Sequence, residues 1–558
     1  MHDNREKIKL LIAESARVVC AQWGISPAEE LPVLETPKSS AHGDLATNLA
    51  MKLARQNKKN PREIASAIKL EIETQCKKEV GYQTLIRKVE VEGPGFINLF
   101  LTETSRADIL LVVQSQNEKF GASHFGNQEK VVIEFVSANP TGPLTIAHGR
   151  QAAIGDALAN ILRTVGYQVH KEFYLNDAGR QIRLLGESLW ARYQSLNGRA
   201  ADVPKEGYQG VYLIELAKEL TNKEGEKLLQ KKEEEAVSGC RQYAVQSILA
   251  GMKKDLKDIG VIFDTYFEES SLHSEGKVNQ ALEKLEENHH LFESEGALWF
   301  RSSVLGDDKD RVLRKQTGEY TYLTADIAYH ESKFNRGYKK IVNLWGPDHH
   351  GYVARLKAAC EALGFSREQI HVLIVQLTTL YRKGVQVRMS TRAGEFVTLR
   401  ELIDEVGADA ARFFFLMRRV ESHLDFDLEL AKEKSQDNPV YYLQYAHARM
   451  ASILAAANRP IDLKADIELL KAPEEIELLK KLADYPETLK QAASSLEPYR
   501  VVEYLRELAA LFHKFYAVCR VIGEEDRLTA ARLLLTDSVR IVIRNGLRIL
   551  GVSQPEKM

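Results

Sequence analysis

The sequence predicts a multidomain α/β protein built around a Rossmann-like, doubly wound parallel sheet. Three observations support this fold class. The chain has 558 residues, enough for three or four domains. Short, nearly unbroken apolar runs at 131–136, 339–345 and 371–377 are typical of strands buried on both faces of a parallel sheet. After about residue 434 the apolar residues recur at helical spacing, which indicates an all-α bundle.

Composition argues against several classes of protein. Apolar residues make up 44% of the chain, and 76 Lys and Arg against 78 Asp and Glu give a net charge of −2. Global disorder and a basic nucleic-acid coat are therefore not expected. The five cysteines form no CxxC pair, so neither a thiolate zinc site nor a disulfide scaffold is indicated. Without a signal-peptide pattern or a long apolar run, we expect a reduced, cytoplasmic protein with no membrane span.

Three domains follow from the change in pattern along the chain. Residues 1–122 are predicted to be an α+β module, residues 123–433 a Rossmann-type domain with insertions, and residues 434–558 a helical bundle. In the first module, Asn60 and Pro61 suit the N-cap and first position of a helix. Alternating residues around the Gly-Pro-Gly turn at 93–95 predict paired strands.

The central domain reads as strand, loop, helix and strand. The strand at 131–136 precedes a Gly/Pro loop and a helix that stops at Gly166, and a second strand follows at 167–175. The same order returns with the strand at 339–345 and the helix at 353–364. The charged stretch 222–239 between these halves is expected to be a solvated insertion helix.

The loop after the first buried strand is the strongest candidate site. Ligands of open parallel sheets bind at the carboxyl ends of strands. The helix that begins near His148 offers free N–H groups and a positive dipole end, which suit a phosphate. Gly149 leaves room for close approach, and His148 could donate a hydrogen bond. The alternative is that the loop is only a tight turn.

Glu134 lies inside a strand that is expected to be buried. A buried carboxylate needs a partner, so either Glu134 meets a cationic ligand or its strand lies at the edge in water. Asp326 offers a second carboxylate, and Tyr322 lies four residues earlier on the same helical face. Such acceptors fit a planar guanidinium. Asp326 could also be a helix cap or a surface acid.

Two further loops follow apolar strands. In the loop 345–352, Asp348, His349 and His350 suggest a metal, but adjacent histidines diverge and no HExxH partner exists, so a helix start that contacts nucleotide or substrate is favoured. In the loop 387–396, Arg388 and Arg392, with Lys383 upstream, could neutralise phosphates or form a solvated basic turn.

In the bundle, Tyr442, Tyr445 and Arg449 share one helix face. Exposed aromatic residues with arginine stack on unpaired bases, although aromatic residues at this spacing are also typical of a core. Arg540, Arg544 and Arg548 form a basic stripe on the last helix, a second candidate for nucleic-acid contact.

Together these segments resemble the arginyl-tRNA synthetase family of class I, in its bacterial type, over nearly the whole chain. PLTIAHGR lies where this class has its HIGH signature, and RMSTR lies where it has KMSKS. AHGDLATNLAMKLA and GPGFINLFL resemble the family's N-terminal add-on domain. The bacterial type is indicated by LGDDKDRVLRK, TYLTADIAYH, GPDHHGY and NPVYYLQYAHAR. The C-terminal run RNGLRILGVSQPEKM is similar to the C-terminal end of this family.

The resemblance implies ATP-dependent ligation of L-arginine to tRNA(Arg) through an arginyl-adenylate, with Mg²⁺ accompanying ATP, by a monomer that needs bound tRNA before it activates arginine. Glu134 and Asp326 would hold the guanidinium with Tyr322 beside them, and Asn139 the α-amino or carboxylate end. The remaining implied residues fall into three groups: signature residues for catalysis (Thr145, His148, Lys383, Arg388, Arg392), ATP contacts (Ala147, His148, Gly149, Gly346, Asp348, His349, His350, Met389, Ser390) and tRNA contacts (Phe96, Asn98, Tyr442, Tyr445, Arg449).

The signatures depart from the family pattern at four positions. Thr145 replaces the first histidine of HIGH, Ala147 replaces its glycine, and Arg388 and Thr391 replace the two lysines of KMSKS. A nearby base is expected to compensate for these lysines. Two other interpretations stay open: a class I synthetase for another amino acid, and an inactive paralogue that only binds RNA.

Overall fold

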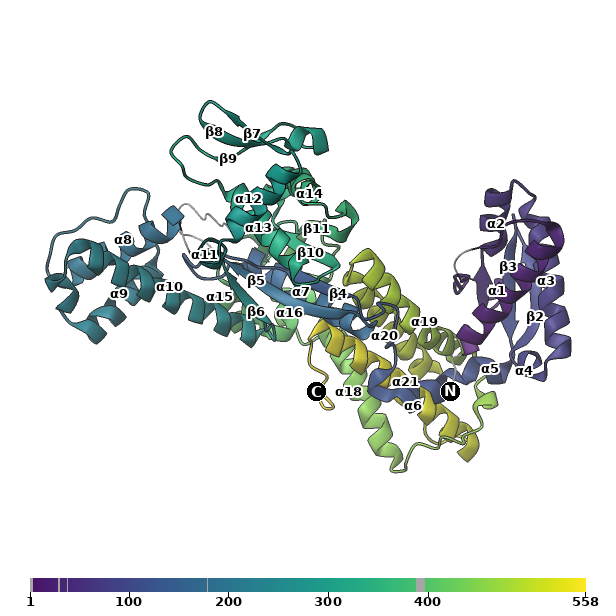
Figure 1. Ribbon diagram of the computed structural model, residues 1–558. Helices are drawn as coiled ribbons and strands as arrows, with labels where there is room; N and C mark the ends of the chain where they lie inside the picture. Colours follow the sequence, from purple (N-terminus) through teal and green to yellow (C-terminus); the bar gives the residue numbers. More distant parts are fainter. Residues whose placement is uncertain (1–3, 29–30, 38, 178, 388–396) are drawn as a thin grey trace.

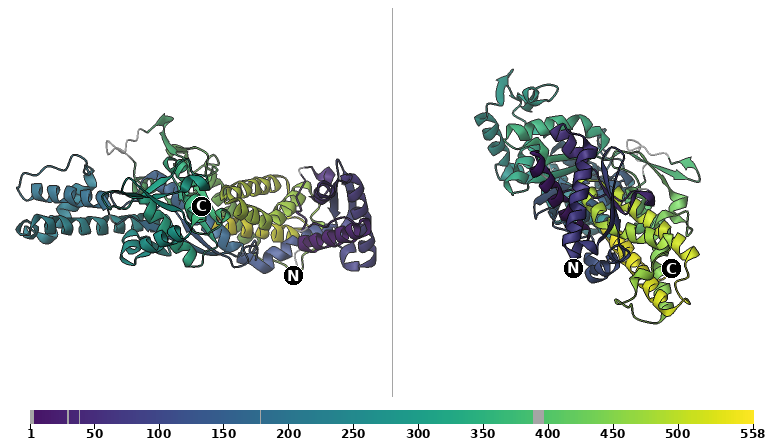
Figure 2. Two further views of the ribbon diagram at one scale, coloured as in Figure 1. Left: turned by 45° about the horizontal axis from the view of Figure 1, so that its top comes forward. Right: turned by 90° about the vertical axis from the view of Figure 1, so that its right-hand side faces the viewer.

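The computed structural model describes residues 4–28, 31–37, 39–177, 179–387 and 397–558. It is elongated, with the N-terminal module at one end and a helical arm at the other (Figure 1). Figure 2 shows the same order from two further directions. The arm consists of α8 (Gly179–Leu196), α9 (Val211–Glu224) and α10 (Glu233–Asp258). The charged stretch 222–239 spans the end of α9 and the start of α10, at the exposed tip that its composition predicts.

The N-terminal module forms its own hydrophobic core, which draws on residues between Ile8 and Leu99. The predicted helix start is confirmed, because the Asn60 side chain accepts a hydrogen bond from the Arg62 N–H at 2.9 Å and Pro61 begins the helix. The predicted hairpin is confirmed as an antiparallel pair, β2 with β3. The elements are α1 (Asn4–Trp23), β1 (Leu45–Thr47), α2 (Leu49–Asn57), α3 (Pro61–Lys78), α4 (Val80–Gln83), β2 (Ile86–Glu92) and β3 (Phe96–Leu101).

The centre of the molecule is the predicted parallel sheet, with five strands among the described residues in the order β11-β10-β4-β5-β6. They are β4 (Lys130–Glu134), β5 (Gln168–Leu175), β6 (Thr265–Glu268), β10 (Lys340–Trp345) and β11 (Ile370–Ile374). The chain adds β5 and β6 on one side of β4, then β10 and β11 on the other. The order therefore reverses between β4 and β10, and ligands of such sheets bind at this switch point.

Helices cover both faces of this sheet. On one face lies α7 (Ile146–Thr164), where Gly155 packs so closely on the Phe135 ring that no Cβ would fit. On the other face, Val132 packs with Phe334 of α13 (Tyr322–Asn335) and Leu356 of α14 (Val353–Ala362). Because β4 is covered on both faces, its unbroken apolar sequence is explained.

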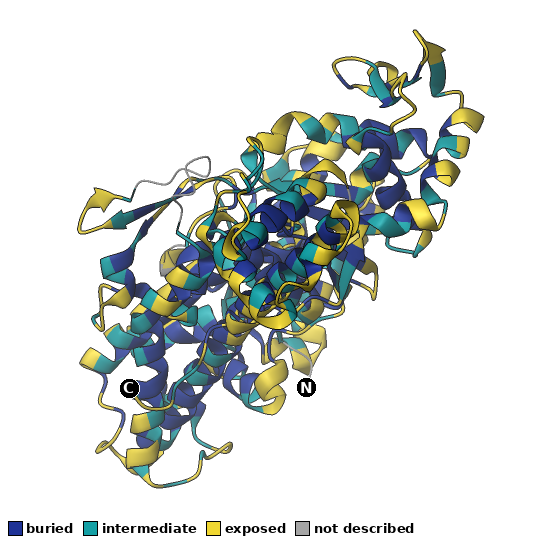
Figure 3. Ribbon diagram, turned by 90° about the vertical axis from the view of Figure 1, so that its left-hand side faces the viewer, coloured by how far each residue is buried: buried dark blue, intermediate teal, exposed yellow. Residues whose placement is uncertain are grey.

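Smaller elements flank the sheet. One group carries a three-stranded antiparallel sheet: α11 (Glu269–Ser274), α12 (Lys277–Glu287), β7 (Leu291–Ser294), β8 (Ala297–Phe300) and β9 (Arg311–Arg314). A second group forms another small sheet with its helices: β12 (Thr378–Arg382), β13 (Val385–Gln386), α15 (Leu399–Val406), α16 (Ala408–Leu416), β14 (Leu424–Asp427) and α17 (Leu428–Lys432). The β12–β13 hairpin projects from the body and is largely exposed (Figure 3).

The C-terminal part is the predicted helical bundle, and its buried residues gather on the inward helix faces (Figure 3). Its helices are α18 (Pro439–Ala457), α19 (Pro473–Ser495), α20 (Tyr499–Val518) and α21 (Asp526–Leu550). The linker helices α5 (Glu103–Ala107) and α6 (Ile109–Gln116) pack against this bundle, with Gln114 donating to Asp537 at 2.8 Å. Among the described residues, no helix is both long and apolar enough to cross a membrane.

The basic stripe on α21 binds other parts of the chain. Arg548 pairs with Glu118 at 3.0 Å, Arg544 donates to the Asn117 side chain, and Arg540 pairs with Asp537 at 2.7 Å. Arginines that are already paired hold the linker after α6 to the bundle. The prediction that this stripe contacts nucleic acid is therefore not supported by its geometry.

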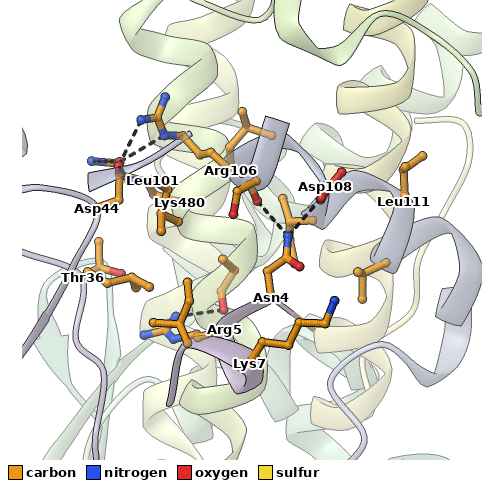
Figure 4. A pocket seen from close by; sticks show the side chains of 17 residues that line it. Asn4, Arg5, Lys7, Thr36, Asp44, Leu101, Arg106, Asp108, Leu111 and Lys480 are labelled. Carbon is orange, nitrogen blue, oxygen red and sulfur yellow. Dashed lines mark hydrogen bonds and ion pairs between the residues drawn. The ribbon is translucent and has the colours of Figure 1, made fainter. Parts of the chain in front are cut away.

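A cavity of about 290 Å³ lies where the N-terminal module meets α19 (Figure 4). Ion pairs join its two sides: Arg5 with Asp484 at 2.7 Å, and Lys480 with Asp44 at 2.9 Å. Arg106 also binds Asp44, at 3.0 Å. The module and the bundle are thus joined by polar contacts as well as by apolar packing.

Candidate functional site

The candidate site lies at the carboxyl ends of β4 and β10, where the strand order reverses. Two loops leave the sheet here: residues 135–145 lead into α7, and residues 346–352 lead into α14. Most of the residues predicted for arginine and ATP lie on these loops or at the start of the helices that follow. The switch point therefore brings together segments that are about 200 residues apart in the sequence.

The chain leaves β4 through a strained turn. Val136 has a φ of 69°, and the Ser137 N–H donates to the Phe135 carbonyl at 2.9 Å, which closes a γ-turn around Val136. A β-branched residue in this region costs on the order of 1–3 kcal/mol. The turn puts the Ser137 hydroxyl between Glu134, to which it donates at 3.0 Å, and the Tyr174 N–H, from which it accepts at 3.1 Å.

Glu134 is buried and already has partners. Its Oε2 lies 2.6 Å from the Lys333 ammonium on α13, and its Oε1 accepts from Ser137. Glu134 therefore meets a cation of the protein itself, as a carboxylate at this depth requires, and its contact with the substrate guanidinium stays a prediction. The alternative of an edge strand in water is wrong, since β4 pairs with a strand on each side.

Asp326 has no ion pair. Its Oδ2 accepts from the Tyr352 hydroxyl at 2.5 Å, and among the described residues no basic side chain lies within ion-pair distance. Burial and, after it, the charges of Glu134 and Glu269 raise the pKa of Asp326 to about 7 against the opposing effects of the Tyr352 hydrogen bond and Lys333. Asp326 is therefore placed to gain from a cationic ligand.

Two residues of this pocket, Tyr352 and Glu269, were not predicted. The hydrogen bond to Asp326 comes from Tyr352, whereas the predicted Tyr322 begins α13 and is 68% exposed. Tyr352 ends the segment GPDHHGY, which the sequence did single out. Glu269 accepts from the Tyr174 hydroxyl at 2.9 Å, and burial raises its pKa. A lone acid at the start of a short helix carries no sequence signal for this role.

His148 is oriented by the start of its own helix. The Thr145 N–H donates to His148 Nδ1 at 3.1 Å, and the Thr145 hydroxyl lies at the same distance from this nitrogen. Since a backbone N–H can only donate, Nδ1 is unprotonated and the proton resides on Nε2. Burial lowers the pKa of His148 to about 4, so the ring is neutral and Nε2–H can donate to an oxygen ligand.

Gly149 has a packing role. A Cβ at this position would lie 2.6 Å from Leu399 and 3.1 Å from Phe415, so the missing side chain lets α7 pack on α15 and α16. The space beside Gly149 is filled by the protein itself, which does not favour the prediction that this glycine leaves room for a ligand. Ala147, in the first turn of α7, is exposed.

The first signature loop is joined through backbone atoms to the residues that begin α15. Thr145 pairs with Thr398 in an isolated β-bridge, and the Leu399 N–H donates to the Leu144 carbonyl at 2.8 Å. Lys383 occupies the exposed turn between β12 and β13 with a φ of 51°. Arg388, Met389, Ser390 and Arg392 lie outside the described residues.

The loop after β10 is exposed at the switch point. Asp348, His349 and His350 lie on the 3₁₀ turn Pro347–Tyr352, which follows the partly buried Gly346. Among the described residues, no three His, Cys, Asp or Glu side chains come together as a metal site. Asn139, on the facing loop, is exposed and donates to the Gln181 side chain at 2.9 Å.

The predicted tRNA contacts lie in two separate places. On β3, Phe96 is partly exposed, but Asn98 is buried and donates to Glu92 at 3.1 Å. On α18, the Arg449 guanidinium lies over the Tyr445 ring at 5.8 Å and over Tyr516 at 4.4 Å.

A cavity of about 580 Å³ adjoins Arg449 and Tyr516. Tyr442 packs on the His513 ring at 4.8 Å, and burial raises the pKa of Tyr442. The α18 face is thus partly core and partly open.

Comparison with protein-family models gives three matches. They are the arginyl tRNA synthetase N terminal domain over residues 6–101, the catalytic domain of tRNA synthetases class I (R) over residues 109–419, and the DALR anticodon binding domain over residues 443–558.

Whole-chain comparisons agree with these models. The chain is 47% identical over 546 residues to an arginine–tRNA ligase of Geobacter sp. (strain M21), covering 97% of each, and 44% identical to that of Geobacillus kaustophilus, covering 99% of each. A crystal structure described as a putative arginyl tRNA synthetase from Campylobacter jejuni is 35% identical and has a TM-score of 0.76, covering 82% of this chain and all of that one. The Thermus thermophilus arginyl-tRNA synthetase, at 23% identity, has a TM-score of 0.78 over 99% of this chain and all of that one, and so shares the fold.

Proposed function

This chain belongs to the arginyl-tRNA synthetase family of class I, and from that premise we propose which of its residues carry the reaction. The reaction is the ATP-dependent ligation of L-arginine to tRNA(Arg) through an arginyl-adenylate. Arginine, and not another amino acid, is the substrate named for the relatives that span nearly the whole chain.

Asp326 anchors the substrate guanidinium. Among the described residues neither Asp326 nor Glu269 has an ion pair, and the unpaired Asp326 carboxylate on α13 carries the proposal. A carboxylate accepts two parallel N–H bonds from a planar guanidinium, whereas an ammonium presents a single point of charge. Glu134 keeps its remaining lone pairs for the substrate, and Glu269 adds negative charge nearby. Asn139, at the mouth of the pocket, holds the α-amino or carboxylate end.

His148 and the N-terminus of α7 hold the phosphates of ATP. The neutral His148 ring donates from Nε2, and the free N–H groups of the first helical turn add their dipole. The loop Gly346–His350 faces the nucleotide from β10. Lys383, Arg388 and Arg392, together with Met389 and Ser390, supply the second signature loop.

Catalysis is positioning plus stabilisation of charge on the phosphates. The arginine carboxylate attacks the α-phosphorus, pyrophosphate leaves, and the 2′-hydroxyl of the terminal adenosine then attacks the activated carbonyl. Mg²⁺ would come with ATP and would offset negative charge on its phosphates.

The remaining domains bind the tRNA. Residues 1–122 contact the tRNA elbow through the partly exposed Phe96, with the buried Asn98 holding the neighbouring Glu92, and residues 434–558 read the anticodon loop through Tyr442, Tyr445 and Arg449. The stacked Arg449, Tyr445 and Tyr516 side chains support this role, since aromatic and guanidinium planes stack on unpaired bases. We propose that the enzyme acts as a monomer in the cytoplasm; one chain matches all three family domains, which is in keeping with a monomer.

Arginine-dependent exchange of pyrophosphate into ATP, measured with and without tRNA(Arg), tests the proposal. We expect exchange only when tRNA is present. An inactive paralogue would bind tRNA and exchange nothing under either condition. Tyr445→Ala should raise the KM for tRNA severalfold and leave ATP binding unchanged. Unchanged charging by this variant would assign the α18 face to the core.

A further inference from the structure

Three polar side chains lie side by side across the middle of the sheet. Glu172 on β5 is in register with Glu134 on β4, and Glu134 is in register with Asn343 on β10. Their exposed fractions are 0%, 7% and 0%. Residues in register point to the same face, so this polar row faces α13. Polar groups at the centre of a parallel sheet destabilise it unless they are paired, so the row depends on its partners on and beside α13.

Lys333 of α13 joins two members of this row. Its ammonium donates to Glu134 Oε2 at 2.6 Å and to Asn343 Oδ1 at 3.1 Å, and it lies 4.0 Å from the centre of the Tyr329 ring. The Lys333 side chain is fully buried. The lysine therefore holds one oxygen of Glu134 in a fixed direction, while the Ser137 hydroxyl holds the other.

The hydrogen bonds continue from Asn343 to the backbone of Asp326. The Asn343 amide donates to His330 Nε2 at 2.8 Å, and His330 Nδ1 donates to the Asp326 carbonyl at 2.8 Å. Only one arrangement satisfies this chain: the Asn343 oxygen faces Lys333, and His330 carries its proton on Nδ1. Burial lowers the pKa of His330 well below its usual value, so this ring is neutral. Glu134 and Asp326 are thus connected through three buried side chains.

We propose that Lys333 is a positioning residue that determines arginine specificity: it fixes the Glu134 carboxylate and offsets part of the negative charge around Asp326, so that Asp326 meets the substrate guanidinium as a carboxylate. Asn343 and His330 hold Lys333 and α13 in register with the sheet. This inference rests on the arginine site proposed above.

The charges around the pocket determine the direction of the effect. Burial, Glu134 and Glu269 raise the pKa of Asp326, whereas Lys333 lowers it. Loss of the Lys333 charge raises this pKa further, so arginine must displace a proton over a wider pH range. The other charged or titratable groups that face this region are Glu172, Tyr174, Asp177, His273, Arg311, Tyr329, His330, Arg336, Tyr352, Arg355 and Cys360.

The test measures the KM for arginine between pH 6 and pH 9 by tRNA-dependent pyrophosphate exchange. For Lys333→Met we expect the KM for arginine at pH 7 to rise at least about fivefold and the midpoint of its pH dependence to move upward by about one unit. The KM for ATP should change less than threefold. An unmoved midpoint would overturn the proposal and leave Lys333 with a structural role only.

A matched control lies on the opposite face of the same sheet. Lys171 is buried and pairs with Asp156 at 2.8 Å, away from the site. Lys171→Met should lower the melting temperature without moving the midpoint of the pH dependence. Lys333→Arg, which keeps the charge, should restore the midpoint of Lys333→Met to within half a unit of the wild-type value. Equal shifts in Lys333→Met and Lys171→Met would contradict a specific role for Lys333.

Two further variants keep the test decisive. If Lys333→Met does not fold, Asn343→Ala takes its place in the test. Loss of this amide should raise the KM for arginine three- to tenfold and leave the KM for ATP nearly unchanged. Asp326→Asn separates the two proposals. If it spares arginine use, the arginine site itself is misplaced; if it abolishes arginine use while Lys333→Met changes neither KM nor midpoint, only the role of Lys333 fails.

Discussion

The two faces of the central sheet each bury a cluster of charges, and the clusters are balanced differently. On the α7 face, Asp156 pairs with Lys171 at 2.8 Å and with Arg412 at 2.7 Å. One acid therefore meets two bases. On the α13 face, four acids meet two bases; these residues are Glu134, Glu172, Glu269 and Asp326 against Lys333 and Arg336.

The balance of charge separates a structural cluster from a binding cluster. Burial alone would raise the pKa of Asp156, but Arg412 and Lys171 outweigh it and hold the pKa below its usual value. At Asp326, burial prevails and the pKa is about 7. The α7 face is complete without a ligand. The α13 face has a surplus of buried acids, which a cation from outside must neutralise, and such a surplus indicates a functional site.

The largest expected effect tests the acid surplus directly. Asp326→Asn removes the carboxylate that has no ion pair, so kcat/KM for arginine should fall by at least a factor of about 100, in keeping with the loss of a charged hydrogen-bonding partner. The KM for ATP should stay within about threefold, because phosphate binding uses other residues. Pyrophosphate exchange with tRNA present measures both constants, and equal losses for the two substrates would contradict the pocket.

Breaking the other cluster should have a different signature. Arg412→Met leaves Asp156 with one base and leaves the Leu550 and Ile259 carbonyls without this donor. We therefore expect a loss of about 3–5 kcal/mol in the free energy of unfolding. The KM for arginine should remain near the wild-type value. Urea denaturation measures the loss. Arg382→Met, which breaks the half-exposed pair with Glu405, is the control and should cost less than about 1 kcal/mol.

The pH dependence distinguishes the faces in the unmodified enzyme. At pH 8 Asp326 is ionised and meets the guanidinium directly, whereas at pH 6 it carries a proton that arginine must displace. With a pKa of about 7, the KM for arginine should rise about tenfold as the pH falls from 8 to 6. Steady-state kinetics at each pH checks this, and a flat profile would place the titrating acid elsewhere. Asp326→Asn should flatten it.

The smallest expected effect concerns the hydroxyl that supports Asp326. Tyr352→Phe removes the 2.5 Å hydrogen bond that opposes the raised pKa. The KM for arginine at neutral pH should therefore rise about three- to fivefold, in line with the loss of one hydrogen bond to a charged group. Tyr322→Phe is the control, because Tyr322 is exposed. If Tyr352 alone supports Asp326, this variant should change the KM for arginine less than twofold.

Local sequence patterns were sufficient for the fold. The unbroken apolar run of β4 and the Asn60–Pro61 cap of α3 depend on neighbours within a few residues, and both are confirmed. The partners of the site residues lie far away in the sequence. Lys333 is 199 positions from Glu134, and a lysine on a helix is usually exposed, so no pattern predicts that it neutralises that acid.

The same reason accounts for the other differences. Gly149 resembled a ligand-binding glycine because the residue that fills its space, Leu399, is about 250 positions later. Tyr322 was selected by helical spacing, but the hydroxyl that reaches Asp326 comes from Tyr352, on a different element. An acid within an apolar strand can be recognised from the sequence, as Glu134 was. Which bases and hydroxyls pair with such an acid depends on tertiary packing, which the sequence pattern does not predict.

Arg412 has a further consequence for how the domains stay together. Its guanidinium donates to the carbonyls of Leu550 and Ile259 and binds Asp156. One buried side chain therefore fastens the end of α21, the end of α10 and the middle of α7 to α16. The bundle cannot separate from the sheet without leaving this interior charge unpaired, so we expect the two parts to move as one unit.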